Sequence, residues 1–384
     1  MAFYLAFKEV WRNKGRFFLF SLVIALITIL VLFVGGLAEG LSSSNREYLD
    51  KLNADLLLFQ KNAELSANAS RIGTSKLNDI RRVEGVKAIG PLGFSTGTLV
   101  FTDGRADLDI SLIGVDAGKP GLPPVLQGQT IRGNRGSEIV IDGKIARFRN
   151  ITVGDTVIVK TIQGLDDSYY KLEVIGITDD QTYLYAPSMF LPYQTWEKVK
   201  PQNTKGASLV DPVSNVVAIQ LDDPNQKELM IQRIESQVDN VQVVDKETAI
   251  RAIPGYLVQQ NTLTTQQSFS LLIGVLVIGG FFQIQTLQKI PQIGVLKAIG
   301  AQNTTVALAA IMQIILVTTF GVLIGGFITW SMSLFIPDTV PLTLEVKNLW
   351  VDIVALLAIG PIGGLVSVRL ATRVEPLRAL GLTN

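Results

Sequence analysis

The chain has 384 residues, and with 48% hydrophobic residues and a mean hydropathy of +0.35 it is too apolar for a soluble protein of two or three domains, so part of it must lie in lipid. It contains no Cys and no His, which excludes disulfides, Cys/His zinc sites, a Cys nucleophile and a His general base. The formal net charge is +1, and no block of basic residues interleaved with aromatics indicates a nucleic-acid surface.

Residues 1–16 predict a short amphipathic helix that lies in the membrane interface on the cytoplasmic side. Lys8 and Arg12 share one helix face, and the apolar residues fall on another at the i, i+4, i+7, i+8 spacing. These apolar residues are Phe3, Phe7, Val10 and Trp11. The alternative is a simple cytosolic extension of the span that follows.

Residues 17–40 contain the clearest membrane span. The stretch 17–38 is free of charge and is long enough to cross about 30 Å of hydrocarbon. It is too long for a signal peptide, although residues 36–38 resemble a cleavage site. Glu39 lies at the outer end of this span, where a carboxylate is costly unless it is solvated or paired. Glu39 is therefore a candidate substrate-binding residue, and an ordinary anion at headgroup level is the alternative.

Residues 41–265 form a polar insertion of globular composition, too long to be a loop. Residues 44–47 have the spacing of a capping box, which predicts that a helix begins there. Short β-rich runs and two helical stretches, 75–83 and 226–238, predict an α+β domain. The β-rich runs are residues 54–60, 98–101, 108–115, 138–142, 155–162, 170–177 and 215–221. Paired carboxylates in this domain have the context of solvated turns, so we expect no catalytic residues here.

Three more apolar stretches complete a membrane α-helical fold of four transmembrane helices, with the α+β domain inserted between helices 1 and 2. These spans are residues 266–288, 306–336 and 349–369, joined by loops at 289–305 and 337–348 and followed by a tail at 370–384. The last span is the weakest prediction, because Asp352 and Pro361 lie within its limits. We expect Asp352 at the level of the outer headgroups.

The charges that flank the spans set their orientation. Residues 1–16, the loop 289–305 and the tail 370–384 carry Lys and Arg, whereas the loop 337–348 holds one Lys against two acidic residues. Both termini and the loop 289–305 are therefore predicted to be cytoplasmic. The inserted domain is predicted to be extracytoplasmic.

The loop 289–305 is unusually apolar for a short cytosolic connection. Its apolar residues are Ile293, Val295, Leu296 and Ile299. They would remain in water unless a partner covered them, and Pro291 is well tolerated in the first turn of a helix. We predict a short helix that docks on a partner. The alternative is an amphipathic turn on the inner leaflet, which Lys289 and Lys297 would suit.

This loop also carries a family resemblance. Residues 288–301 read QKIPQIGVLKAIGA, which resembles the basic-x-x-acidic-Ile-Gly-x-Leu-Lys-Ala-x-Gly-Ala segment of FtsX-like, macrolide-exporter-type ABC transporter permeases. Pro291 and Gln292 depart from that pattern, which usually has a non-proline residue and a Glu there. Similar pieces recur in the family's order along nearly the whole chain, at residues 54–55, 137–143, 153–157 and 373–380.

The resemblance implies that the loop is the segment that couples the permease to its ATPase. The coupling residues that it implies are Lys289, Pro291, Gln292, Ile293, Gly294, Val295, Leu296, Lys297, Ala298 and Gly300. The ATPase must be a separate chain, because no G-x-x-x-x-G-K-[ST] motif occurs in this one. The departures at Pro291 and Gln292 would make the docking contact less ionic than usual.

The resemblance further implies a non-catalytic subunit of the bacterial cytoplasmic membrane, embedded in the lipid bilayer as two copies with two ATPase subunits that bind ATP. Movement of the ATPases would pass through the spans to the outer domain and export an amphiphile, with no cofactor resident in this chain. Hemin is the candidate substrate, because the chain looks closest to hemin-exporter permeases. An extracytoplasmic adaptor would complete such a pump. The alternative is a regulatory mechanotransmitter that controls an extracytoplasmic cell-wall hydrolase or acts as a sensor.

Overall fold

The computed structural model describes residues 8, 11–202, 213–337, 340–344 and 346–373. Most of the predicted N-terminal amphipathic helix and of the C-terminal tail therefore lies outside the described residues. The chain divides into two compact units. A helical unit comprises Met1–Gly40 and Gln260–Asn384, and a globular unit comprises Leu41–Gln259.

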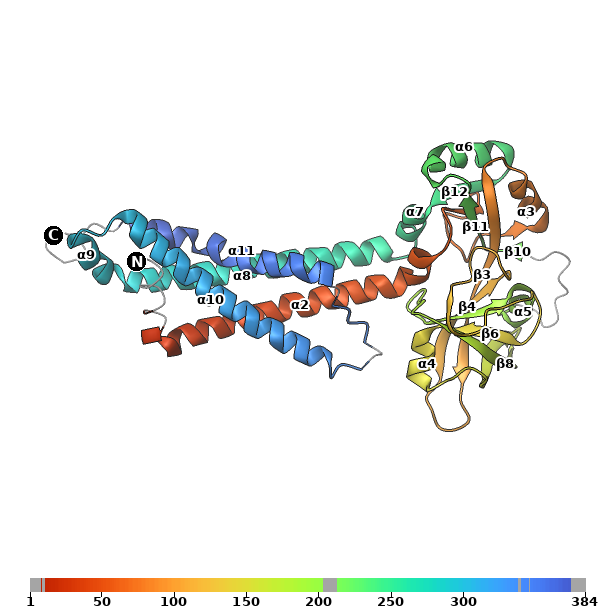
Figure 1. Cartoon of the computed structure of the whole chain (residues 1–384), viewed down its shortest axis with the longest axis horizontal. Coiled ribbons are helices and arrows are strands. Elements are labelled where there is room, and N and C mark those ends of the chain that lie inside the picture. The colour runs from red at the N-terminus through yellow and green to blue at the C-terminus, as the bar shows by residue number, and fades with distance from the viewer. Residues whose placement is uncertain (1–7, 9–10, 203–212, 338–339, 345, 374–384) are drawn as a thin grey trace. The chain divides into compact units, whose positions relative to one another are not determined.

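Four long helices build the helical unit (Figure 1). They are α2 (Lys14–Lys51), α8 (Tyr256–Gln288), α10 (Asn303–Ser333) and α11 (Val346–Thr372), and the short helix α9 (Ile290–Ala298) connects α8 to α10. In the described part of the chain, these four are the helices that are long and apolar enough to cross a membrane. The predicted fold class is confirmed: four candidate transmembrane helices, with a globular domain between the first helix and the rest.

Glycine lets the long helices approach closely. A Cβ on Gly325 of α10 would lie 2.6 Å from the Ala25 carbonyl oxygen of α2, and one on Gly360 of α11 would lie 2.2 Å from Thr318 Oγ1 of α10. Both distances are far below van der Waals contact, so any side chain at either position would force the helices apart. These small residues therefore serve packing within one chain.

Helix α2 is unbroken from Lys14 to Lys51. The predicted helix start at residues 44–47 is therefore wrong. Instead of reaching back to a capping N–H, the Glu47 carboxylate accepts a hydrogen bond from Lys144 Nζ at 3.0 Å. A capping box is a local pattern, and here a partner distant in sequence uses the same side chain.

The globular unit is built on one mixed sheet of ten strands, in the order β12-β1-β11-β3-β4-β9-β6-β8-β5, with β7 pairing with β3 and β8. The strands of this sheet are β1 (Leu56–Gln60), β3 (Val86–Val100), β4 (Leu108–Val115), β5 (Val125–Gly128), β6 (Glu138–Ile141), β7 (Thr156–Gln163), β8 (Asp166–Thr178), β9 (Ser188–Pro192), β11 (Val216–Leu221) and β12 (Val241–Asp245). The pairs β4–β9 and β6–β8 are parallel and the other pairs are antiparallel. A separate two-stranded sheet pairs β2 (Ile72–Gly73) with β10 (Val213–Ser214).

Strand β3 divides the unit into two lobes. Its first half pairs with β11, from Val86 to Leu92, and its second half pairs with β4, from Gly93 to Leu99. The first lobe holds β1, β11 and β12 with helices α3 (Thr74–Arg81) and α6 (Lys227–Gln237), and α7 (Lys246–Arg251) follows β12. The second lobe holds β4 to β9 with helices α4 (Gly143–Arg149) and α5 (Tyr193–Val199).

The core of the second lobe is centred on Trp196 of α5, which is 1% exposed. A Cβ on Gly93 or on Gly114 would lie 2.4 Å or 2.6 Å from atoms of its indole ring, so both strands need glycine beneath it. In the ten-stranded sheet, the sequence pattern missed most of β3 and all of β5, β9 and β12. Gly93 of β3 and Gly114 of β4 make room for a buried ring, which the local sequence does not indicate.

Candidate functional site

The sequence of α9 defines both ends of the helix. Pro291 lies in its first turn, where the missing N–H costs nothing. Beyond its last turn, Gly300 takes a left-handed φ of +96°. The Gly300 N–H donates to the Lys297 carbonyl at 3.0 Å, and the Ala301 N–H donates to the Leu296 carbonyl at 3.1 Å. This pair of bonds is a Schellman motif, which satisfies the last carbonyls of the helix and favours glycine at the left-handed position.

Gly300→Ala should loosen the end of α9. A side chain in the left-handed region costs about 1–2 kcal/mol, and no atom lies within 4 Å of the Cβ position, so the cost comes from the backbone alone. Hydrogen exchange of the 289–305 amides in the purified chain should accelerate roughly 5- to 30-fold. Gly280→Ala is the matched control, because Gly280 of α8 also has open space around it but no left-handed φ. Equal exchange in both variants would contradict the cap.

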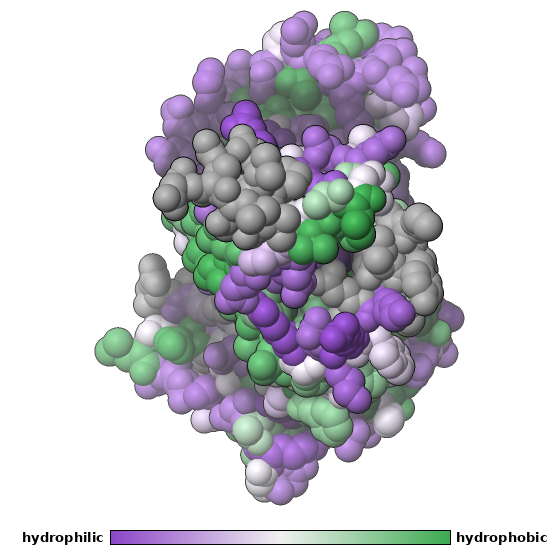
Figure 2. Space-filling view, turned by 90° about the vertical axis from the view of Figure 1, so that its left-hand side faces the viewer, coloured by the Kyte–Doolittle hydropathy of each residue, from purple (hydrophilic) through white to green (hydrophobic). Residues whose placement is uncertain are grey.

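One face of α9 is apolar and exposed. Val295 is 49% exposed and Ile299 is 79% exposed, and Pro291 and Ala298 are also exposed. Counted from Pro291, these positions are i, i+4, i+7 and i+8, which is one side of a helix. Figure 2 looks onto the end of the chain where α9 lies in Figure 1, and hydrophobic surface lies there beside hydrophilic residues. We call these four residues the outer face of α9.

The remaining predicted coupling residues take different positions. Gln292 is exposed next to the outer face, Gly294 is buried, and Ile293, Leu296 and Lys297 are half-buried on the opposite side. The sequence did not separate the exposed Val295 from the half-buried Leu296. That distinction depends on which side of α9 meets the helical unit.

Hydrogen bonds anchor both ends of α9 to the long helices. Lys297 Nζ donates to the Thr372 carbonyl at 2.8 Å, which places a cation at the C-terminus of α11. At the other end, Lys289 Nζ donates to Gln313 Oε1 of α10 at 3.3 Å and lies 5.5 Å from the Phe17 ring of α2. These contacts join α9 to α10 and α11 and place Lys289 close to α2.

Glu39, the candidate substrate-binding residue, is half-buried on α2 between two tightly packed glycines. The Gly36 carbonyl accepts a hydrogen bond from the Thr343 N–H at 3.1 Å. A Cβ on Gly40 would lie 1.7 Å from the Pro341 carbonyl oxygen. The connection between α10 and α11 thus covers the α2 turns on either side of Glu39. Its role in substrate binding stays a prediction.

A second carboxylate, Asp352, lies in this part of the helical unit. Its expected place at the level of the outer headgroups stays a prediction, and its Oδ1 accepts a hydrogen bond from Gln267 Nε2 of α8 at 2.8 Å. Its Oδ2 lies 3.0 Å from the position that a Cβ on Gly35 would take, so the carboxylate also lies against α2. Gly35 and Glu39 are four residues apart on one face of α2. The available signal was the presence of polar residues in two predicted spans, which usually pair between helices.

Glu47 joins the end of α2 to the second lobe. Its Oε2 accepts hydrogen bonds from Lys144 Nζ at 3.0 Å and from the Thr182 N–H at 3.3 Å, and its Oε1 accepts one from Lys51 Nζ at 3.1 Å. The side chains of Glu47 and Lys144 are only 18% and 23% exposed, so water screens this pair less than a surface pair. We call Glu47, Lys51, Lys144 and Thr182 the Glu47 cluster. It ties α2 to α4 and to the connection between β8 and β9.

Asp142 binds the backbone of the second lobe beside the Glu47 cluster. Its carboxylate accepts hydrogen bonds from the N–H groups of Lys144 at 2.7 Å, Gln181 at 3.0 Å and Ser188 at 3.2 Å. Burial raises the pKa of the Asp142 carboxyl to about 6, although these N–H donors act in the opposite direction. The Asp142 carboxylate therefore joins the start of α4 to residues 181–188.

Comparisons with known proteins agree with this arrangement along the whole chain. Residues 17–237 match the family model of the MacB-like periplasmic core domain, and residues 268–376 match that of the FtsX-like permease C-terminal region. A relative from Staphylococcus haemolyticus, named as a hemin transport system permease protein, HrtB, is 28% identical over 98% of this chain and 99% of its own. A permease of Mycobacterium tuberculosis, named as an uncharacterized ABC transporter permease, is 22% identical over the same shares.

Two solved structures resemble the globular part. The extracellular domain of the ABC-type transporter YknZ from Gram-positive bacteria is 19% identical, with a TM-score of 0.37, and the match covers 50% of this chain and 100% of that chain. The periplasmic region of MacB from Actinobacillus actinomycetemcomitans is 18% identical, with a TM-score of 0.36, and the match covers 54% of this chain and 96% of that chain.

Proposed function

This chain belongs to the family of MacB-like and FtsX-like ABC transporter permeases, and from that premise we propose that it couples ATP hydrolysis by a separate ATPase chain to the export of an amphiphile. The outer face of α9 carries the proposal. Val295 and Ile299 remain in contact with water unless a partner covers them. Full burial of a side chain of this size stabilises a complex by about 1.5–3 kcal/mol, so the face supports specific docking.

The contacts of α9 support transmission of movement. Lys289 and Lys297 tie it to α10 and α11, so a docked ATPase that turns α9 also displaces the ends of these helices. Helices α2 and α8 are each unbroken across the boundary between the helical and globular units, at Gly40 and Gln260. In this proposal two copies of the chain work with two ATPases in the bacterial cytoplasmic membrane. The globular unit is the moving extracytoplasmic part.

The proposed orientation is open to a labelling test, because the chain has no Cys of its own. A single Cys at Leu165, a fully exposed residue between β7 and β8, should react with a membrane-impermeant maleimide on intact cells. A single Cys at Ile299, which is exposed on α9, should react only after permeabilisation. The basic flanks of the spans set this expectation. The reverse pattern would place α9 outside and remove the ATPase contact.

Hemin is the proposed substrate, because the relative from Staphylococcus haemolyticus is named for hemin transport and resembles this chain from end to end. A chain without Cys and His would hold hemin through other groups, such as a carboxylate, Tyr or Met. Glu39 supplies a carboxylate at the outer end of the first span, beside the polar contact of Asp352 with Gln267. We assign it the role of contacting the substrate there.

A reconstituted complex of the chain with its ATPase tests substrate and site together. Adding hemin should stimulate ATP hydrolysis, and Glu39→Gln should remove most of that stimulation while basal hydrolysis remains, because the substitution keeps the shape and deletes the charge. Glu228→Gln is the matched control, since it deletes an exposed carboxylate from α6. If wild type were not stimulated, hemin would be excluded as substrate. Equal stimulation in Glu39→Gln would exclude Glu39 from the site.

A further inference from the structure

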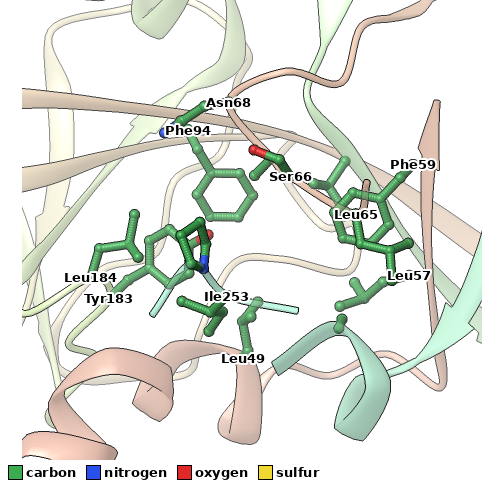
Figure 3. A pocket seen from close by; sticks show the side chains of 14 residues that line it. Leu49, Leu57, Phe59, Leu65, Ser66, Asn68, Phe94, Tyr183, Leu184 and Ile253 are labelled. Atoms are coloured by element: carbon green, nitrogen blue, oxygen red, sulfur yellow. The ribbon is translucent and has the colours of Figure 1, made fainter. Parts of the chain in front are cut away.

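The globular unit contains a partly enclosed apolar cavity of about 210 Å³. Its lining includes Leu49 of α2 and Ala249 of α7 together with Leu57 and Phe94 of the sheet. In Figure 3, Leu57 lies beside Phe59 and Leu65, and Phe94 lies on the side of Tyr183. No Lys, Arg, Asp or Glu is among its lining residues. A charged ligand would lose its hydration there without compensation, so the cavity favours a neutral one.

Two strained backbone segments border the cavity. Among the described residues, seven other than Gly have a positive φ, and three of these are Asn, which tolerates it. The other four are Glu64 and Leu65 in the β1–β2 connection and Leu184 and Tyr185 between β8 and β9. Leu65 and Leu184 line the cavity themselves. Such conformations cost about 1–3 kcal/mol each and persist where the surroundings impose them, which is common at ligand clamps.

Both strained segments are held by hydrogen bonds outside the cavity. At the start of the β1–β2 connection, the Lys61 N–H donates to the Asn240 carbonyl at 3.1 Å. Near its end, Ser70 Oγ accepts a hydrogen bond at 2.8 Å from the N–H of Gln60, the last residue of β1. In the other segment, the Tyr185 N–H donates to the Ser44 carbonyl of α2 at 3.0 Å. Hydrogen bonds outside the cavity therefore hold both strained segments in place and leave the cavity open.

Three polar residues, Ser66, Asn68 and Tyr183, are among those that line the cavity, and Tyr183 is the most buried of them. Tyr183 is 6% exposed, and burial raises the pKa of its phenol far above the usual value, so the hydroxyl is a proton donor at any physiological pH. A buried donor of this kind gains about 0.5–1.5 kcal/mol from an acceptor. The end of a lipid acyl chain carries no hydrogen-bond acceptor. The Tyr183 hydroxyl therefore favours a free small molecule that has one.

We propose that this cavity binds a compact, neutral, mainly hydrocarbon molecule with one oxygen acceptor, held by the Tyr183 hydroxyl and clamped by Leu65 and Leu184. Its volume suits roughly six to ten carbon atoms, since an apolar cavity of about 150 Å³ accepts benzene. Hemin is excluded, because it is far larger and carries two carboxylates. The site thus goes beyond the proposed transport function. Its ligand would contact both the end of α2 and α7, and so act on the transporter as an effector.

Hydrogen exchange on the full chain in lipid nanodiscs, without ATPase, tests the site. Acetophenone is the probe, and ethylbenzene is the same shape without the oxygen. At ten times its Kd, acetophenone should slow exchange about tenfold in peptides covering residues 61–70 and 183–186 but not in β7 and β8. Absence of that slowing at saturation would overturn the proposal, whatever becomes of the transport function.

Two variants assign the effect to the cavity. Ala249→Phe places a ring in the space and should abolish the response to acetophenone; Ala67→Leu, at another lining position, serves the same purpose if the first variant does not fold. Tyr183→Phe keeps the ring and should make acetophenone bind no better than ethylbenzene. A full response in the filled variants would place the probe elsewhere. A retained preference for acetophenone in Tyr183→Phe would overturn the assignment of the phenol.

Discussion

Replacing both Val295 and Ile299 with Asp should abolish coupled transport while the chain remains folded in the membrane. Both side chains are exposed, so the carboxylates are solvated in the free protein. On docking they would be buried against the ATPase, where an unpaired ion costs several kcal/mol. A loss of about 3 kcal/mol weakens the complex roughly 100-fold. Co-purification of the ATPase and substrate-stimulated ATP hydrolysis in nanodiscs measure the effect.

Two controls separate docking from folding in this experiment. Thr304→Asp adds one carboxylate, half the charge of the Asp pair, at an exposed position in the first turn of α10, where a carboxylate is favourable at a helix N-terminus, and should change neither readout. Val295→Thr keeps the shape of the side chain and should cause an intermediate loss. An Asp pair that left both assembly and stimulation intact would show that the outer face of α9 is not the docking surface.

Glu47→Gln should weaken the link between α2 and the second lobe of the globular unit, and so reduce transport, without disturbing the ATPase. The substitution removes the charge that Lys144 and Lys51 share, and leaves Lys144, which is only 23% exposed, without its carboxylate. We expect a loss of about 1–2 kcal/mol in unfolding free energy. We also expect a several-fold loss of transport with basal ATP hydrolysis and assembly unchanged.

The control for this variant is another ion pair of the same domain. Glu247→Gln breaks a surface pair with Arg251, whose partners are 70% and 62% exposed, and should have almost no effect. Combining Glu47→Gln with Lys144→Met should cost less than the sum of the single changes, because both act on one contact. Additive losses, or unaltered transport in Glu47→Gln, would rule out the Glu47 cluster as a mechanical link.

The membrane part of the fold could be predicted from the sequence because its signal is local. Long apolar runs marked the spans, and Pro291 fitted the first turn of a short helix after the second span. Whether that helix couples to an ATPase stays a prediction. Which of its residues face outward could not be derived, since Val295 and Leu296 differ only in their contacts with the rest of the helical unit.

The errors have a common origin in partners distant in sequence. The spacing of residues 44–47 suggested a helix start, but Glu47 pairs with Lys144, almost a hundred residues later. The partner of Asp352 is Gln267 of another helix, which the sequence did not indicate. Most of β3 was missed, and Gly93 within it makes room for Trp196, far along the chain. In each case the role of a residue depends on a tertiary partner that a local rule does not include.

The position of β1 in the sheet suggests an order of folding for the globular unit during synthesis. Leu58 pairs with Val217 on one side and Val243 on the other, so this strand leaves the ribosome long before either neighbour. At about 5–20 residues per second, its apolar segment waits roughly ten to thirty seconds for a partner. The second lobe, formed by consecutive chain from β4 to α5, folds during that interval. We therefore expect the first lobe to close last, because β1 stays unpaired until β11 and β12 have been made.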